Sequence, residues 1–406
     1  KLVHVVALGF CLHFFAEIAS AQYLNRALYL GRGEEQVRRN YNQDFEYYLD
    51  RFSFVDMPPW WNERLEPFRN RFFAGGGSVS SADLTLEGQL NLTVPIGRGV
   101  SVGFYYLESE NQANQYQRVA PALDYQFSPD MSVFALLEGT VEKEDDDLSF
   151  GMNLFHTQRG RTRFMFTFAD FSDGKSQEFE YTKKSYGLMV SGDYHWDGGS
   201  EVYYETSAQL PFEQRFTNDD ALFNMWRVIA LGEGRYALNG RDKLVLAIYT
   251  EFTKKSLEPD DTSSPLNEDF DGNLQRVRLE WWRKISNDSQ WSTGLSALRL
   301  RNDGLRSNNP AQNLEEHRDE LLIVARMRIA FTGLILFEPN IWAGYVDYRN
   351  QLGGVTVNKD FDGFQGKLGL PLILRFSKDA LLSLQPTVQL DQLTFGGGSI
   401  QFQALF

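Results

Sequence analysis

The chain ends in Ser399-Ile400-Gln401-Phe402-Gln403-Ala404-Leu405-Phe406, in which apolar and polar residues alternate. Successive side chains of a β-strand point to opposite faces, so Ile400, Phe402, Ala404 and Phe406 share one face and the other face is mostly polar. One wholly apolar face and one wet face are typical of a sheet with lipid on one side and water on the other.

This segment resembles the last strand of Gram-negative outer-membrane β-barrels, whose terminal aromatic residue is read by the barrel-assembly machinery. The resemblance implies a porin-like, integral outer-membrane barrel that contacts outer-membrane lipid and lipopolysaccharide. It covers the architecture of residues 71–406, and no single porin family is close enough for site residues to be transferred. The edge strand of a soluble sandwich also alternates and is the alternative, with a β-propeller as the next soluble fold to consider.

The first 21 residues are predicted to be a secretory signal peptide. Leu2 to Phe15 is an apolar stretch behind basic Lys1, and Ala19-Ser20-Ala21 is a cleavage site of small residues before Gln22. The single cysteine, Cys11, lies in this stretch, so disulfides and thiolate chemistry are not expected in the mature chain. After Ala21 no long uncharged apolar run follows, so a membrane-spanning chain of this sequence has to be a barrel.

Short turn signals recur roughly 30 to 50 residues apart, the spacing of two membrane-crossing strands of about ten residues plus one longer loop. The predicted turns are Gly97-Arg98-Gly99, Pro129-Asp130, Arg159-Gly160, Gly198-Gly199, Asn239-Gly240, Asn287-Asp288, Pro339-Asn340 and Lys378-Asp379. The predicted long loops are Asn111 to Arg118, Glu142 to Asp147, Ser172 to Lys184, Pro211 to Asp220, Lys255 to Asp271, Asn302 to Arg318 and Gln351 to Asp360.

With a first strand in Arg71 to Ser81, these signals predict an all-β, antiparallel up-and-down barrel of about eighteen strands. Sixteen strands is the alternative if Gly75-Gly76-Gly77, a poor strand core, only leads into the barrel.

Alternation within the strands predicts which side chains face lipid. The outward sets are Leu188, Val190 and Tyr194; Phe164, Phe166 and Phe168; Ile323, Ala325, Met327 and Ile329; and Leu368, Leu370, Leu372 and Leu374. An aromatic girdle is expected near strand ends at Trp196, Tyr204, Trp226, Tyr236, Trp281, Trp291, Trp342 and Tyr348.

The inward sets carry charge. A basic lumen wall is predicted at Arg227, Arg235, Arg276, Arg278, Arg326, Arg328 and Lys367, with Arg349 and Arg375 in the same phase and with Glu233 and Glu280 among them. An acidic wall is predicted in the first half at Asp124, Glu138, Asp193, Glu201 and Glu205. Two such walls facing each other would set up a transverse field, as in the constriction of diffusion porins. The alternative is that these charges pair across neighbouring strands in a plugged interior.

Residues 22–70 differ in character from the rest. Apolar residues at helical spacing predict an amphipathic helix from about Glu34 to Asp50, followed by Met57-Pro58-Pro59-Trp60-Trp61. The segment is expected to be a lumen plug or a periplasmic docking arm through Tyr41, Phe45, Tyr48, Trp60 and Trp61. A helix that only caps the barrel mouth is the alternative.

The predicted function is an outer-membrane channel for passive diffusion of small polar or charged solutes. A barrel in an export or envelope-assembly complex, such as polysaccharide secretion with a periplasmic partner protein, is the alternative; a sealed structural or adhesive barrel is a third. The net charge of −14 argues against nucleic acid as a partner.

Catalysis is not expected, because Ser191 and His195 on one strand stand roughly 13 Å apart at about 3.3 Å per residue. No cofactor is expected either, and the only candidate metal ligands are acidic loop clusters that could hold Ca²⁺ or Mg²⁺. Those clusters are Glu142 to Asp147, Glu258 to Asp261, Asp269 to Asp271 and Asp360 to Asp362.

Overall fold

The computed structural model describes residues 70–406 with internal gaps. The gaps are 79–83, 112–114, 141–146, 158, 169–178, 217–220, 261–266, 287–288, 359–361, 378 and 391–392. The expected signal peptide, the expected helix and the aromatic residues Tyr41, Phe45, Tyr48, Trp60 and Trp61 lie outside the described residues.

Within the described residues the chain forms β-strands and one short 3₁₀ helix, η2 (Pro310–Gln312). The first strands are β1 (Arg71–Ser78), β2 (Leu84–Gly97), β3 (Val100–Asn111), β4 (Gln115–Ser128), β5 (Met131–Thr140), β6 (Asp147–Phe155), β7 (Gly160–Phe168), β8 (Phe179–Lys183), β9 (Tyr186–His195), β10 (Glu201–Phe216) and β11 (Ala221–Ala237). The rest are β12 (Asp242–Pro259), β13 (Glu268–Lys284), β14 (Gln290–Leu305), β15 (Leu314–Ala330), β16 (Ile335–Phe337), β17 (Asn340–Leu352), β18 (Val355–Asn358), β19 (Gly363–Gly369), β20 (Leu372–Ser377), β21 (Ala380–Gln389) and β22 (Thr394–Leu405).

Three barrel strands are interrupted and comprise more than one segment. β8 and β9 both pair with β10, β16 and β17 both pair with β15, and β18, β19 and β20 follow one another along β17 and β16. The 22 segments therefore form 18 barrel strands, which confirms the predicted number.

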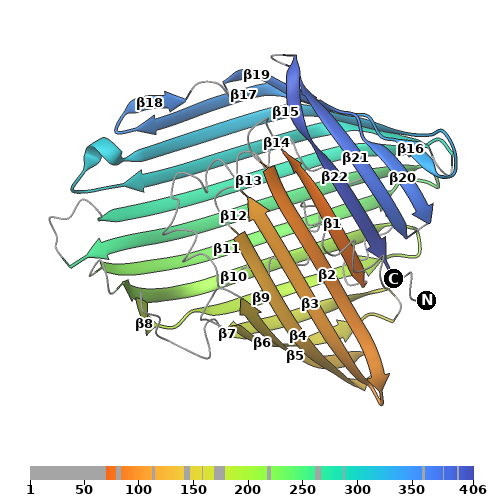
Figure 1. Ribbon diagram of the computed structural model, residues 1–406, viewed down its shortest axis with the longest axis horizontal. Helices are drawn as coiled ribbons and strands as arrows, with labels where there is room; N and C mark the ends of the chain where they lie inside the picture. The colour runs from red at the N-terminus through yellow and green to blue at the C-terminus, as the bar shows by residue number, and fades with distance from the viewer. Residues whose placement is uncertain are drawn as a thin grey trace.

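The barrel is closed by its first and last strands (Figure 1). β1 pairs antiparallel with β2 on one side and with β22 on the other, from Arg71↔Leu405 to Ser78↔Gly398. The predicted first and last strands are thus confirmed, and Gly75, Gly76 and Gly77 belong to the pairing. Closure satisfies the backbone N–H and C=O groups that an open sheet would leave unpaired in lipid.

Tight turns join the strands at one end of the barrel. The turns predicted at Gly97–Gly99, Pro129–Asp130, Arg159–Gly160, Gly198–Gly199 and Asn239–Gly240 each connect consecutive strands, and those at 287–288 and 378–379 fall in the β13–β14 and β20–β21 connections. Gly99 has φ +77°, and a Cβ there would lie 2.5 Å from the Gln126 carbonyl oxygen, so only glycine fits.

The turn predicted at Pro339-Asn340 is wrong. The chain reverses at Phe331 to Leu334 instead, where the backbone N–H of Phe331 donates to the Ile335 carbonyl oxygen. Pro339 interrupts a barrel strand between β16 and β17, and Pro371 interrupts the neighbouring one between β19 and β20. Proline is enriched both in turns and at strand breaks because it lacks an N–H donor, so sequence alone did not distinguish the two uses.

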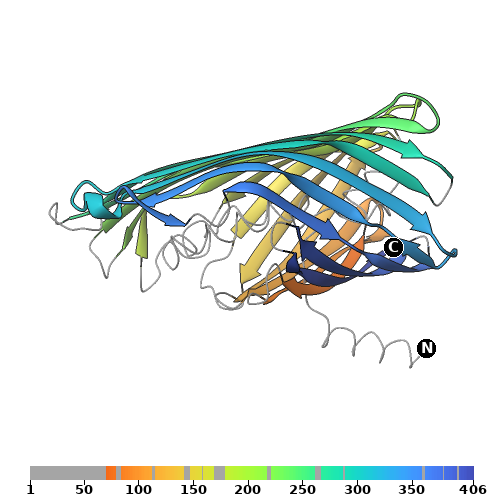
Figure 2. The same cartoon turned by 90° about the horizontal axis from the view of Figure 1, so that it is seen from above.

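The barrel is higher on one side than on the other (Figure 2). β10 to β15 have 16 to 18 residues each, whereas β1 to β7 have 8 to 14. Figure 2 shows the green and cyan strands extending past the orange ones at the end opposite the tight turns. We call the part of β10 to β17 that extends there the overhang.

The overhang lies where the sequence predicts loops. The predicted strand length of about ten residues is therefore wrong for β10 to β15, which are longer. Pro211 to Phe216, Lys255 to Pro259, Asn302 to Leu305 and Leu314 to Arg318 are all strand. Most of their outward residues are polar, as in the ion pairs Arg301–Asp319, His317–Asp303 (3.1 Å) and Arg349–Glu315 (3.3 Å). The apolar alternation used to recognise strands therefore stops at the membrane edge, although the hydrogen-bond ladder continues. Arg349, predicted inward, is one of these outward residues.

Below the overhang the outer face is an apolar belt. On β15 the belt runs from Leu321 to Ile329, with Leu321 and Ile323 each 58% exposed. Nine residues span about 30 Å along a strand, or about 23 Å of membrane at the usual tilt, close to the apolar band of outer-membrane barrels. The chain is an outer-membrane β-barrel, as the terminal strand predicted.

Aromatic residues border the belt on the turn side. Tyr236 (63% exposed), Trp196 (48%) and Trp281 (36%) face outward there, and the Trp281 and Trp291 rings pack at 5.0 Å. Two predicted girdle residues do not belong to it, because Trp342 and Tyr348 face the lumen and are 1% and 7% exposed. Among the described residues no helix is long and apolar enough to cross a membrane.

The belt predicts that the loss of unfolding free energy caused by a charged substitution depends steeply on how deep in the membrane the substituted residue lies. Ala325→Arg, near the middle of the belt on β15, is expected to destabilise the folded barrel by about 2–4 kcal/mol, and Leu321→Arg, at its edge, by about 0–1 kcal/mol. Reversible urea unfolding in lipid vesicles measures both. Equal costs at the two positions would mean that the belt is misplaced.

Candidate functional site

The candidate site is a network of paired charges on the lumen face of the turn-side half of the wall from β9 to β17. We call it the inner network. Its carboxylates are Asp193, Glu201, Glu233, Glu280 and Glu338, and its cations are Arg235, Lys243, Arg278, Arg326 and Arg328.

Arg235 on β11 lies at one centre of the network. Its guanidinium contacts Glu233 (2.6 Å) on the same strand and Glu201 (3.2 Å) on β10. Glu201 also accepts from Lys243 (3.5 Å) on β12, so one carboxylate links three strands. All of these except Lys243 are buried, and buried carboxylates of this kind remain charged only when paired.

Glu280 on β13 lies at the second centre. It is 0% exposed, contacts Arg278 (2.9 Å), and accepts hydrogen bonds from the Ser292 hydroxyl (2.8 Å) and the Trp282 indole N–H (3.0 Å). Arg278 also reaches Glu233 (3.7 Å), which joins the two centres.

The Trp282 ring on β13 contacts one cation from a strand on each side of it, and both cations lie on the lumen face. The guanidinium carbons of Arg235 and Arg326 lie 4.9 and 5.4 Å from its centroid. Arg326 has Glu280 and Glu338 as its nearby anions, and Arg328 forms an ion pair with Glu338. Aromatic faces stabilise desolvated cations, so Trp282 supports two arginines at once.

The network continues to β9 through a histidine. The two ring nitrogens of His195 contact Asp193 (3.0 Å) and Glu201 (3.4 Å). The imidazole is thus oriented by carboxylates, and Ser191, which shares its face, is buried separately. This arrangement does not assemble the nucleophile and base that hydrolysis needs.

A smaller polar cluster lies on the opposite wall. Asp124 on β4 accepts from the Ser132 hydroxyl and the Asn153 amide, both at 2.9 Å, and Arg163 Nε donates to Asn153 Oδ1 (2.9 Å). Arg163 also lies over the Phe134 ring at 4.6 Å. Arg161 and Arg163 bring positive charge to a wall that was predicted to be acidic.

The predicted separation into a basic and an acidic wall is therefore not what the structure has. Both walls carry charges of both signs, and the inner network has five carboxylates beside five cations. The reason is that a buried charge requires an opposite charge nearby, so each arginine is accompanied by an acid on its own or an adjacent strand. The alternative stated for the sequence, pairing across strands, describes the contacts better.

The other predicted wall residues have individual partners. Arg227 pairs with Glu251 (2.5 Å), and Arg276 lies over the Trp342 ring at 5.1 Å. Glu205 accepts from the Tyr203 hydroxyl (2.7 Å), and Lys367 is buried on β19. Glu138 lies in β5, but its side chain is outside the described ones.

Several lumen residues were missed. Glu251, Trp282, Arg318, Glu320 and Glu338 all face inward, and Arg318 and Glu320 form a buried ion pair. Arg318 and Glu320 lie eight residues before Arg326 and Arg328 on β15 and therefore share their face. The sequence predicts a loop at Asn302 to Arg318, so the alternation was not extended to these residues.

Between the charged groups the lumen face is apolar. We call this surface the lumen strip; it is a buried cluster on β13 to β17 made of Leu274, Leu298, Leu300, Leu322, Val324, Trp342, Val346 and Tyr348. A second buried cluster, Phe212, Phe223 and Met225, lies on the inner face of the overhang.

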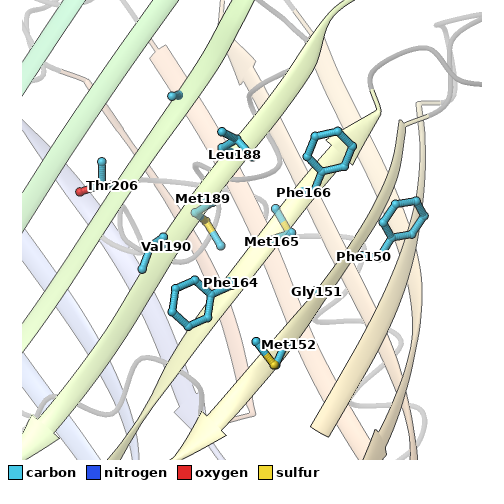
Figure 3. Close-up of a pocket in the computed structure, with 11 residues that line it drawn as sticks. Phe150, Gly151, Met152, Phe164, Met165, Phe166, Leu188, Met189, Val190 and Thr206 are labelled. Carbon is cyan, nitrogen blue, oxygen red and sulfur yellow. The ribbon is translucent and has the colours of Figure 1, made fainter.

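An apolar groove of about 410 Å³ lies on the outer face over β6, β7, β9 and β10 (Figure 3). Phe150, Phe164 and Leu188, which line it, are each 38–43% exposed, and Thr206 and Ala208 are the small side chains beside them. Most of the residues that line the groove belong to the lipid belt.

Metal sites stay a matter of prediction. Among the described residues no group of three or more His, Cys, Asp or Glu is arranged to hold an ion. The acidic stretch 142–146 and parts of the other loop clusters lie outside those residues.

No protein-family model matches the sequence, and no curated protein matches it. Solved structures similar to the chain include a bacterial polysaccharide outer membrane secretin (6% identity, 83% of this chain and 98% of that one, TM-score 0.38). They also include OccAB2 of Acinetobacter baumannii (10%, 83% and 96%, 0.38) and OmpT, an outer membrane protein of Vibrio cholerae (6%, 83% and 96%, 0.39). The closed barrel is established by the strand pairings of the chain itself, independently of these similarities.

The inner network predicts a large cost for removing one member. Glu280→Gln leaves Arg278 and Arg326 with less compensation, and we expect a loss of about 3–5 kcal/mol in unfolding free energy. Asp319→Asn is the matched control, because its ion pair with Arg301 lies on the water-exposed overhang and contributes about 0–1 kcal/mol. A small loss for Glu280→Gln would contradict a tightly coupled network.

Proposed function

We propose that this protein is an outer-membrane channel through which small polar or charged solutes diffuse. The observation that carries the proposal is the inner network, a run of paired charges on the lumen face of neighbouring barrel strands. Eighteen strands enclose more space than side chains alone fill, so barrels of this size usually leave a path for water and solutes.

The network gives such a path a polar wall whose charges are fixed by their neighbours. Fixed ion pairs present donors and acceptors to a passing solute without a large net field. The expected mechanism is diffusion without chemistry, and selectivity between anions and cations is expected to be modest.

The position of Lys243 allows a direct test. Its side chain is 31% exposed on the lumen face of β12, within 3.5 Å of Glu201. Lys254 on the same strand faces outward, 46% exposed and 3.7 Å from Asp271, which makes it a matched control.

In planar bilayers, Lys243→Gln is expected to shift the reversal potential in a salt gradient toward cations, by on the order of twofold in permeability ratio. Lys254→Gln removes the same charge outside the lumen and is expected to leave the ratio unchanged. If the two variants behave alike, solutes do not pass along the network. Absence of conductance in every form of the protein would exclude the channel.

A further inference from the structure

Three prolines lie beside one another in the barrel wall. Pro339 lies between β16 and β17, Pro371 between β19 and β20, and Pro386 within β21, so each belongs to a different one of three neighbouring barrel strands. We call these three residues the proline line. Each accepts one backbone hydrogen bond from the strand before it: Met327 N–H donates to the Pro339 carbonyl oxygen (3.0 Å), Glu338 N–H to that of Pro371 (2.9 Å), and Leu370 N–H to that of Pro386 (2.9 Å).

The return bond is missing at each of these positions. Residues of a hydrogen-bonded antiparallel pair exchange two N–H···O bonds, and proline has no N–H to donate. The ladder therefore lacks one bond at each of three successive strand interfaces. Side chains replace part of this loss: Asn340 Nδ2 donates to the Glu338 carbonyl oxygen (3.4 Å), and beyond β21 the Thr387 hydroxyl donates to the Gly397 carbonyl oxygen (2.8 Å).

The interface between β21 and the strand before it is also short. Among the described residues, β19 pairs with β21 from Lys367↔Gln389 to Gly369↔Thr387, and β20 pairs with β21 from Leu372↔Leu384 to Ser377↔Ala380 (Figure 1). β11 and β12, by contrast, pair along the whole of β11. A bond missing from a short interface lowers the free energy that local opening of the wall requires there.

The two faces of this part of the wall differ in chemistry. Leu372 and Leu384 face lipid, whereas Lys367, Gln385 and Gln401 are buried on the lumen face. An opening between β20 and β21 therefore has an apolar outer edge and an inner edge of amide and cationic groups. These edges match a molecule with a hydrocarbon tail and an anionic head.

We propose that the wall opens locally at the proline line, between β20 and β21, and that a single-chain amphiphile with an anionic head passes there between the lumen and the membrane. The head moves along the lumen amides and Lys367 while the tail stays in lipid, so no hydrocarbon chain has to enter water. This lateral route is separate from the diffusion of polar solutes along the lumen, and it goes beyond the proposed function.

Hydrogen exchange of the full-length protein in lipid vesicles tests the opening. Pro386→Val supplies the missing N–H opposite Leu370 and keeps an apolar side chain toward lipid. Exchange of the β20 and β21 amides is therefore expected to slow by about tenfold, the effect of one hydrogen bond of ordinary net strength. Pro121→Val on β4 is the matched control, because Pro121 is also exposed but neither β3 nor β5 beside it contains a proline. Equal exchange in the unchanged protein and in Pro386→Val would overturn the opening.

A reversible crosslink across the same interface prepares a test of the passage. Leu368 and Val388 are paired residues of β19 and β21, and paired Cα atoms of antiparallel strands lie about 4.5–5.5 Å apart, within the range of disulfides. The double variant Leu368→Cys/Val388→Cys therefore locks the interface on oxidation. Leu246→Cys/Leu279→Cys locks β12 to β13 in the same way and is the matched control. Cys11, the only cysteine of the chain, lies in the expected signal peptide.

The probe is octadecyl phosphate with a diazirine beside the phosphate, incorporated into the vesicle membrane before illumination. We expect mass spectrometry to find the probe attached to Gln385 or Gln401 on the lumen face. Oxidation of the Leu368→Cys/Val388→Cys variant is expected to abolish this attachment and reduction to restore it, whereas oxidation of the control variant leaves it unchanged. Absence of attachment at both glutamines, or attachment that persists in the locked barrel, would overturn the passage. Neither readout depends on conductance, so a failure of the channel proposal is distinguishable from a failure here.

Discussion

The closed hydrogen-bond ladder is the constraint on which the molecule depends. In hydrocarbon, each unpaired backbone N–H or C=O group costs several kcal/mol, so a sheet in the membrane cannot have an edge. The pairing of β1 with β22 removes the edge, and it fixes which residues face lipid and which face the lumen. The positions of the belt, the girdle and the inner network all follow from that register.

Within the belt, local alternation was enough to predict the structure. Ile400 and Phe402 on the last strand and Ile323, Ala325 and Met327 on β15 face lipid as their spacing indicates, because lipid selects apolar residues at every second position. Beyond the belt, water lies outside the sheet and that selection ends. The sequence consequently predicts loops where the strands of the overhang lie and a turn at Pro339, because the pairing of these segments depends on neighbours far away in sequence.

The sequence predicts on which face of its strand each charged residue of the site lies, but it does not predict which residues that side chain contacts. Arg235, Arg278 and Arg326 lie on the lumen face because they alternate with lipid-facing residues, and this can be followed along one strand. That Glu201 is shared by Arg235 and Lys243, or that Trp282 supports two arginines, depends on the lateral register of several strands. A single strand carries no information about that register. A count of arginines along the chain therefore suggested a field across the lumen, whereas pairing within the wall neutralises it locally.

For the proposed channel, the unequal height of the wall would decide from which side a solute approaches the lumen. Because β10 to β15 continue above the belt and β1 to β7 end lower, the described strands of the wall end at unequal heights above the membrane surface. A molecule that arrives along that surface from the low side meets the entrance at its own height, whereas one arriving from the high side meets a charged outer wall. In the proposed channel, the encounter of such a molecule with the lumen would depend in part on two-dimensional diffusion along the lipid head groups, and the crowding of that layer would be part of the barrier to entry.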